Sequence, residues 1–148
     1  MRTAPDHLPA AIELWLDETG CIEDISFCFV YGSAARGTAG EESDIDTLLV
    51  TKEDVTDAQR SALSASYAQL QRRLGYTPDA VYPLELWSVR ECLQHLSATD
   101  PDDDARELAF ALTDDRLVVV DSPDAATLIE SARLLTSSKK EKTTKNER

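Results

Sequence analysis

Apolar and polar positions recur with two different periods along this chain, and the periods divide it into strands and helices. Runs of β-type residues predict strands at 24–31, at 44–51, from about 84, and at 117–120. Helical spacing of apolar residues predicts helices at 6–19, 56–75, 88–96, 106–112 and 122–135. Strands that alternate with helices in this order predict an α/β domain with a small mixed β-sheet and helices mainly on one face.

The chain has room for one domain with a modest core, because it is 148 residues long. We assign this domain to residues 1–136. Residues 137–148 have no apolar side chain to bury, so we predict a disordered polar tail there. No stretch is long and apolar enough for a membrane span, and the first eleven residues lack the apolar region of a signal peptide.

The segment between the first two predicted strands, 31–46, carries the candidate chemistry. Asp44 and Asp46 begin the second of these strands, and successive strand side chains point to opposite faces, so the two carboxylates share a face. The backbone amides of Gly32 and Ser33 can meet an anion at the mouth of the loop. Two like charges held close together require a cation, and a hard divalent ion with oxygen ligands is the usual one. The segment therefore predicts a metal and phosphate site.

Three short motifs stand at fixed spacing in this segment: Gly32-Ser33, Ala35-Arg36-Gly37 and Ser43-Asp44-Ile45-Asp46. With them the chain resembles the nucleotidyltransferase superfamily of DNA polymerase β, most closely its minimal nucleotidyltransferases and aminoglycoside adenylyltransferases. The resemblance covers 31–50, with weaker support as far as Ser88. It implies that Gly32 and Ser33 open the triphosphate-binding loop, that Asp44 and Asp46 hold magnesium, and that Arg36 is a phosphate partner.

The superfamily has a third acidic residue on a later strand, and this sequence offers Asp79 and Glu85. Six residues of extended strand span about 20 Å, so we expect at most one of them to reach the metals. Pro83 cannot donate to a strand ladder, which places the start of the paired strand near Leu84 and favours Glu85. The segment Pro83–Leu86 also looks like the one that carries the Glu general base in aminoglycoside adenylyltransferases.

The resemblance implies magnesium-dependent transfer of a nucleoside monophosphate, AMP from ATP, to a hydroxyl of a small-molecule or protein acceptor. Asp44 and Asp46 would hold two magnesium ions, and Glu85 would accept the hydroxyl proton or complete a metal shell. The larger antibiotic-modifying relatives add a helical acceptor domain that this chain is too short to hold. We therefore expect a homodimer or a partner protein, as in toxin–antitoxin pairs. The alternative is a catalytically degenerate, antitoxin-like binding or regulatory module.

Net charge limits the classes of binding partner, and the cysteines indicate the cellular environment. The formal net charge is −13, and residues 137–148 carry five basic and two acidic groups, which leaves −16 on residues 1–136. A surface this negative repels a phosphate backbone, so we expect no nucleic-acid partner. The three cysteines lack the spacing of a disulfide framework or a zinc site, as is typical of a reducing cytoplasm.

Overall fold

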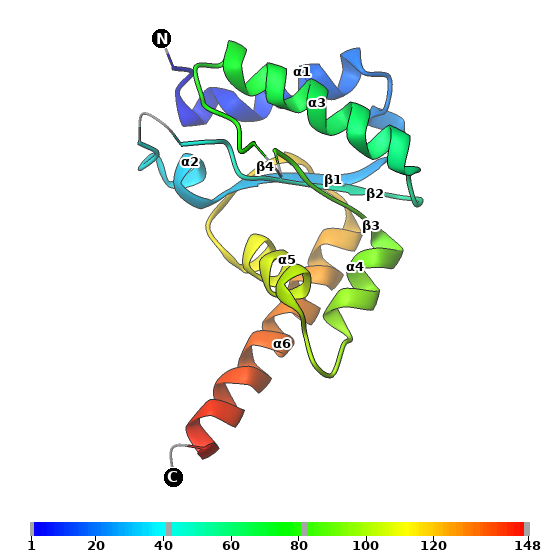
Figure 1. The fold of residues 1–148 in the computed structure, drawn as a ribbon, viewed down its shortest axis with the longest axis vertical. Coiled ribbons are helices and arrows are strands. Elements are labelled where there is room, and N and C mark those ends of the chain that lie inside the picture. Colours follow the sequence, from blue (N-terminus) through cyan, green and yellow to red (C-terminus); the bar gives the residue numbers. More distant parts are fainter. Residues whose placement is uncertain (1, 41–42, 81–82, 147–148) are drawn as a thin grey trace.

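The computed structural model describes residues 2–40, 43–80 and 83–146, and a four-stranded mixed sheet lies at its centre (Figure 1). The strand order is β3-β2-β1-β4, with bounds β1 Ile25–Tyr31, β2 Thr47–Thr51, β3 Glu85–Ser88 and β4 Arg116–Val120. β1 pairs antiparallel with β2 and with β4, whereas β2 and β3 are parallel. Parallel neighbours need a crossover connection, and the α3 helix supplies it between β2 and β3. The mixed sheet and the α/β class are confirmed.

The described helices follow the predicted order, with one addition. They are α1 Leu8–Glu18, α2 Gly32–Arg36, α3 Asp57–Arg73, α4 Val89–Leu96, α5 Asp103–Thr113 and α6 Pro123–Asn146, with short 3-10 turns at Pro5–His7 and Ile22–Asp24. The α2 helix occupies a segment that we expected to be a loop. The α6 helix continues beyond residue 135, where we expected it to end; the disordered tail at 137–148 stays a prediction. Among the described residues, no helix has the length and apolar character needed to cross a membrane.

Helices cover both faces of the sheet, whereas we expected them mainly on one. The α1 and α3 helices lie over one face, and α4, α5 and α6 lie over the other (Figure 1). The cause is visible in β1, all seven residues of which are buried. A strand with one solvated face would alternate polar and apolar residues, so an unbroken apolar run such as Phe27–Val30 indicates a strand covered on both sides.

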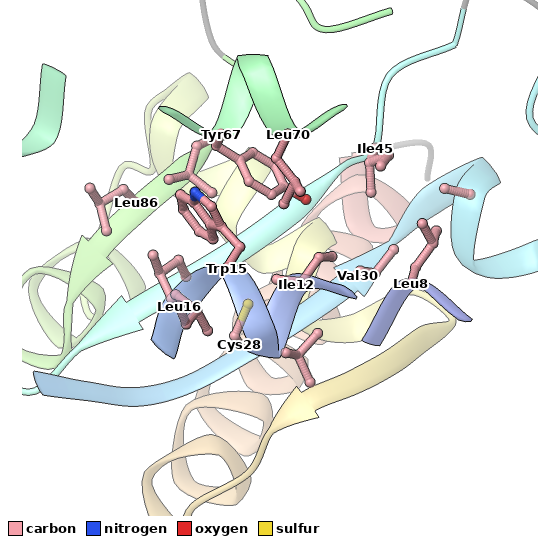
Figure 2. Close-up of a cluster of buried hydrophobic side chains, with 14 of the residues drawn as sticks. Leu8, Ile12, Trp15, Leu16, Cys28, Val30, Ile45, Tyr67, Leu70 and Leu86 are labelled. Carbon is pink, nitrogen blue, oxygen red and sulfur yellow. The ribbon is translucent and has the colours of Figure 1, made fainter. Parts of the chain in front are cut away.

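Each face of the sheet therefore has its own hydrophobic core. In the α1/α3 core, Trp15 and Tyr67 pack with ring centroids 5.0 Å apart above Cys28 and Val30 of β1 (Figure 2). In the α5/α6 core, Phe27 and Phe29 point the other way and pack with Leu108, Leu112 and Leu128, among others. The alternation of side chains along β1 thus divides the apolar residues between the two layers.

Polar caps fix where three of the helices begin. Thr56 and Gln59 form a reciprocal capping box at the start of α3, and Ser88 and Glu91 form another at the start of α4. The Asp102 carboxylate accepts from the Ala105 backbone N–H at the start of α5. The starts of α3 and α4 were predicted from sequence, because these residue types satisfy the free N–H groups of a first helical turn, whereas α5 begins three residues before the predicted Arg106.

Truncation of leucines tests the two-layer packing. Leu16 faces the α1/α3 core and Leu108 the α5/α6 core, both fully buried, while Leu14 on the same helix as Leu16 is 58% exposed. Leu16→Ala and Leu108→Ala should each lower the free energy of unfolding by about 2–5 kcal/mol in urea titrations. Leu14→Ala should change it by less than about 0.5 kcal/mol. A Leu108→Ala variant as stable as the Leu14→Ala control would contradict the second layer.

Candidate functional site

Asp44 and Asp46 lie in the segment that leads into β2, beside the end of β1. The Tyr31 backbone N–H donates to the Asp46 carbonyl oxygen at 2.9 Å, which holds the two strand ends together. Ile45, between the two aspartates, is fully buried, and its N–H donates to the Gln71 side-chain oxygen at 2.8 Å. We expected the strand itself to begin at Asp44, but it begins at Thr47. Both aspartates nevertheless line one pocket, so the predicted convergence is present.

Gly32 brings the backbone of the β1–α2 turn against the Asp46 carboxylate. Its φ of +70° lies in the left-handed region, and a Cβ at this position would lie 2.5 Å from Asp46 Oδ2. Any side chain would therefore displace the carboxylate or the turn. Ser33 follows, half-buried, as the second residue of α2, and Arg36 lies exposed at the end of that helix. The structure thus brings the two aspartates and the Gly-Ser turn together, as predicted.

Glu85 lies at the start of β3, beside the start of β2. In the parallel register Glu85 is level with Leu48, two residues beyond Asp46, and its side chain lines the same pocket as the aspartates. Asp79 is exposed but lines that pocket too, and its charge contributes to a raised pKa of Asp44. Our expectation that only one of them could reach the site assumed an extended chain. The described residues between Asp79 and β3 are not in a strand, so their separation in sequence does not set their separation in space.

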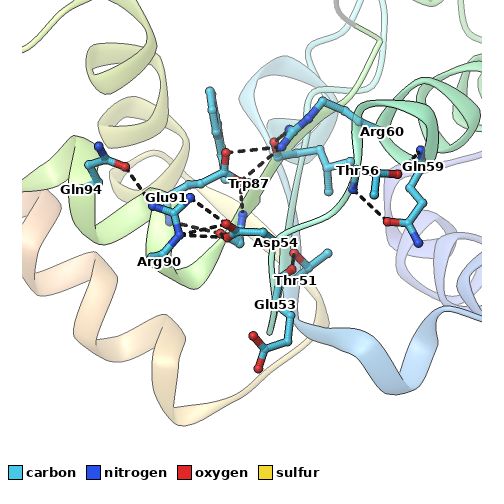
Figure 3. Close-up of polar contacts among 12 residues, drawn as sticks. Thr51, Glu53, Asp54, Thr56, Gln59, Arg60, Trp87, Arg90, Glu91 and Gln94 are labelled. Carbon is cyan, nitrogen blue, oxygen red and sulfur yellow. Dashed lines mark hydrogen bonds and ion pairs between the residues drawn. The ribbon is translucent and has the colours of Figure 1, made fainter.

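Trp87 holds the Glu85 side chain, and Figure 3 shows Arg60 and Glu91, which make contacts beside Trp87. The Trp87 indole N–H donates to Glu85 Oε1 at 2.5 Å. The Arg60 guanidinium lies 5.6 Å from the centroid of the Trp87 ring, donates to the Leu86 carbonyl oxygen and pairs with Glu91 at 3.2 Å. These contacts join α3, β3 and α4 at one edge of the pocket, so Glu85 stands on rigid elements rather than on a loop.

The pocket has a volume of about 660 Å³ and is strongly acidic. Among the described residues, its acidic lining residues are Asp44, Asp46, Asp57, Asp79, Glu85, Glu91, Asp103, Asp104 and Glu107, and its one basic lining residue is Arg60. Sequence reasoning did not place Asp103, Asp104 and Glu107 here, because the local pattern predicts a helix without showing which part of the sheet it meets. Their spacing of one helical turn was the available signal. Only the packing of α5 against the sheet shows that this turn faces the aspartates.

Burial and mutual repulsion make the aspartate pair costly to ionise. Burial, and next the charge of Asp44, raises the pKa of Asp46 to about 7. Burial also raises the pKa of Asp44, and it raises that of Glu85 against the opposing hydrogen bond from Trp87. A divalent cation with oxygen ligands would relieve this repulsion, so the donor set of Asp44 and Asp46 fits magnesium.

Glu85 stands apart from this donor pair. Within residues 2–40, 43–80 and 83–146, no three His, Cys, Asp or Glu side chains are arranged to share one metal ion. Asp44, Asp46 and Glu85 therefore do not form a single ligand set in this conformation. Glu85 remains a third carboxylate of the same pocket, and its role as a metal ligand stays a prediction.

Comparison with known proteins shows the family to which this chain belongs. The profile of the nucleotidyltransferase domain family matches residues 19–102, which contain the Gly-Ser turn, both aspartates, Asp79 and Glu85. No protein of curated function matches the sequence.

Solved structures with the same fold include several toxin–antitoxin complexes. A chain of a toxin–antitoxin crystal structure with AMP-PNP aligns with a TM-score of 0.58 and 15% identity, over 95% of this chain and 99% of that chain. A chain of a mutant MntA-HpeT toxin–antitoxin structure aligns with a TM-score of 0.57 and 14% identity, over 95% and 98%. A chain of the tri-AMPylated Shewanella oneidensis HEPN toxin in complex with MNT antitoxin aligns with a TM-score of 0.50 and 13% identity, over 95% and 100%. At these identities the likeness establishes the fold alone.

The raised pKa of Asp46 predicts how stability depends on pH without divalent cations. The folded protein binds the Asp46 proton up to about pH 7, whereas the unfolded chain releases it near the ordinary pKa of 3.8. The contribution of Asp46 to the free energy of unfolding is therefore fully present below about pH 4 and is lost as pH rises through 7. In EDTA, the melting temperature of wild type should fall between pH 5 and pH 8 more steeply than that of Asp46→Asn.

Asp17→Asn is the matched control for this measurement, because Asp17 is exposed on α1 and is not among the residues that line the pocket. Its profile should follow that of wild type. If the melting temperatures of wild type and Asp46→Asn changed with pH in parallel, the pKa of Asp46 would not be raised in the folded protein.

Proposed function

Because the chain belongs to the nucleotidyltransferase domain family, we propose that it transfers AMP from ATP, with magnesium, to a hydroxyl group of a partner protein. The observation that carries the proposal is the single pocket lined by Asp44, Asp46 and Glu85, with the Gly32 backbone directly against Asp46. Carboxylates that can bind a metal, beside backbone amides that can bind phosphate, are the parts that phosphoryl chemistry requires.

The turn and the aspartate pair would hold the nucleotide. The amides of Gly32 and Ser33, with the Arg36 guanidinium, would bind the phosphates that leave as pyrophosphate. Asp44 and Asp46 would hold two magnesium ions. Bound magnesium would neutralise charge on the triphosphate and stabilise the charge that develops as the α-phosphorus is attacked.

Glu85 would act on the acceptor. Its carboxylate lies in the same pocket as Asp46 but outside the donor pair, where an incoming hydroxyl can meet it. Burial raises its pKa, and a carboxylate with a raised pKa is a better proton acceptor near neutral pH. The Trp87 indole would keep the carboxylate oriented while the proton is accepted.

The acceptor is inferred from charge and from the neighbours. Nine acidic side chains of the described residues line the pocket, and residues 1–136 carry a net charge of −16, so a nucleic-acid acceptor is electrostatically disfavoured. The structural neighbour with a tri-AMPylated HEPN toxin combines an AMP-modified protein with an MNT antitoxin, which supports a protein acceptor for this chain. A small cationic molecule with a hydroxyl group is the other acceptor that the negative potential of this pocket would attract. A non-catalytic, antitoxin-like binding module would keep the fold and the nucleotide affinity without transfer.

Nucleotide binding should depend on the aspartates and on magnesium. Two carboxylates repel a bare triphosphate and attract it through a cation. Calorimetry should detect ATP binding with magnesium and almost none with EDTA, and Asp46→Asn should remove most of the magnesium-dependent part. Asp17→Asn should behave as wild type. Equal binding with and without magnesium would rule out the proposed site.

Transfer should depend on Glu85 far more than binding does. With radiolabelled ATP and the protein encoded by the neighbouring gene as acceptor, Glu85→Gln should reduce labelling by about 100-fold or more and leave ATP affinity nearly unchanged. Glu53→Gln, an exposed residue after β2, should have no effect on either quantity. ATP binding by wild type without labelling of that protein or of a small aminoglycoside would favour the non-catalytic module.

A further inference from the structure

A carboxylate of this chain already occupies the phosphate-binding turn. Asp114, the first residue after α5, accepts a hydrogen bond from the Gly32 backbone N–H at 3.1 Å through Oδ2. The same oxygen forms an ion pair with Arg36 Nη1 at 2.7 Å. The Asp114 side chain is only 16% exposed. The amide and the guanidinium that would bind triphosphate are therefore both engaged by one internal anion.

One face of α5 holds this carboxylate in place. Glu107, Phe110 and Asp114 follow each other at spacings of three and four residues, so they lie on the same side of the helix and its C-terminal cap. Glu107 accepts from the Tyr31 hydroxyl at 3.1 Å, and the Phe110 ring meets the Tyr31 ring edge-on at 5.9 Å. Three consecutive contacts thus tie α5 to Tyr31 and Gly32. These contacts position the Asp114 side chain against the Gly32 turn and keep it largely out of the solvent.

We propose that Asp114 is an internal competitor of the nucleotide, which occupies the Gly32 amide and Arg36 until a magnesium-bound triphosphate displaces it. The inference rests on the proposed function, because it assigns a role in the same site. A carboxylate and a phosphate oxygen use the same donors, and two anions on one amide and one guanidinium repel each other. Nucleotide binding must therefore move the Asp114 side chain away from Gly32.

Displacement of Asp114 weakens nucleotide binding and links it to α5. The triphosphate binds only molecules in which Asp114 has left the turn. Its affinity is therefore proportional to the fraction of such molecules, as for any ligand that binds a minor state. A charge-assisted hydrogen bond and an ion pair together hold the occupied state, which corresponds to an affinity reduction of about tenfold. Asp114 follows the last residue of α5, so its displacement breaks a side-chain contact that joins the end of this helix to the Gly32 turn.

Selective isotope labelling can detect the contact directly. The chain has five glycines, and Tyr31-Gly32 is its one Tyr-Gly pair. In protein labelled with carbonyl-13C tyrosine and 15N glycine, a single amide signal therefore reports Gly32. Asp114→Asn should shift this signal in the nucleotide-free protein, because it replaces a charged acceptor by a neutral one. Asp115→Asn, the exposed neighbour, should leave it unchanged. A Gly32 signal that does not respond to Asp114→Asn would overturn the proposal.

Affinity measurements test the competition itself. Calorimetry with inorganic triphosphate and magnesium should give about tenfold tighter binding to Asp114→Asn than to wild type, with Asp115→Asn equal to wild type. Equal or weaker binding by Asp114→Asn would overturn the competitor role and leave the nucleotide site in place. If neither wild type nor Asp114→Asn binds triphosphate or ATP with magnesium, the proposed function fails and the competitor role fails with it.

Discussion

The contact between the Gly32 backbone and the Asp46 carboxylate is the constraint on which the rest of the site depends. It places the turn that we propose binds phosphate and the carboxylate that we propose binds metal closer together than any side chain at position 32 would allow. The hydrogen bond from Tyr31 N–H to the Asp46 carbonyl oxygen fixes the same junction from the backbone side. Two groups of opposite preference, one for anions and one for cations, thus share one small volume. A magnesium-bound phosphate is a ligand that satisfies both at once.

The two-layer core makes this junction rigid. β1 is buried on both faces and hydrogen-bonded on both edges, so its end at Tyr31 cannot move without disturbing two hydrophobic layers. Ile45 anchors the loop between the aspartates in one of these layers. The acidic side chains then project from a well-packed frame, where their repulsion cannot be relieved by a small backbone shift. Burial of Asp46 in this frame, and next the charge of Asp44, raise the pKa of Asp46 to about 7.

The sequence predicted the parts of the site that depend on local pattern. The Gly-Ser turn, the Asp-x-Asp pair, the starts of α3 and α4 and the position of Glu85 at the start of β3 follow from spacing and residue type over short distances. The contributions of α5 could not be predicted in this way. Glu107 and Asp114 reach the site only because α5 packs against the end of β1, and a helical pattern shows which face is apolar without showing which strand it meets. Asp79 also lines the pocket, which we did not expect because we assumed an extended chain, whereas the described residues between Asp79 and β3 are not in a strand.

The central claim is that one site holds a divalent cation on Asp44 and Asp46 and a triphosphate on the Gly32 turn. The most direct test is a crystal structure with manganese and a non-hydrolysable ATP analogue, with the cation located by its anomalous signal. The account predicts a manganese peak between the Asp44 and Asp46 carboxylates, with phosphate oxygens on the amides of Gly32 and Ser33. A peak elsewhere in the acidic pocket, or a triphosphate bound away from the Gly32 turn, would contradict it.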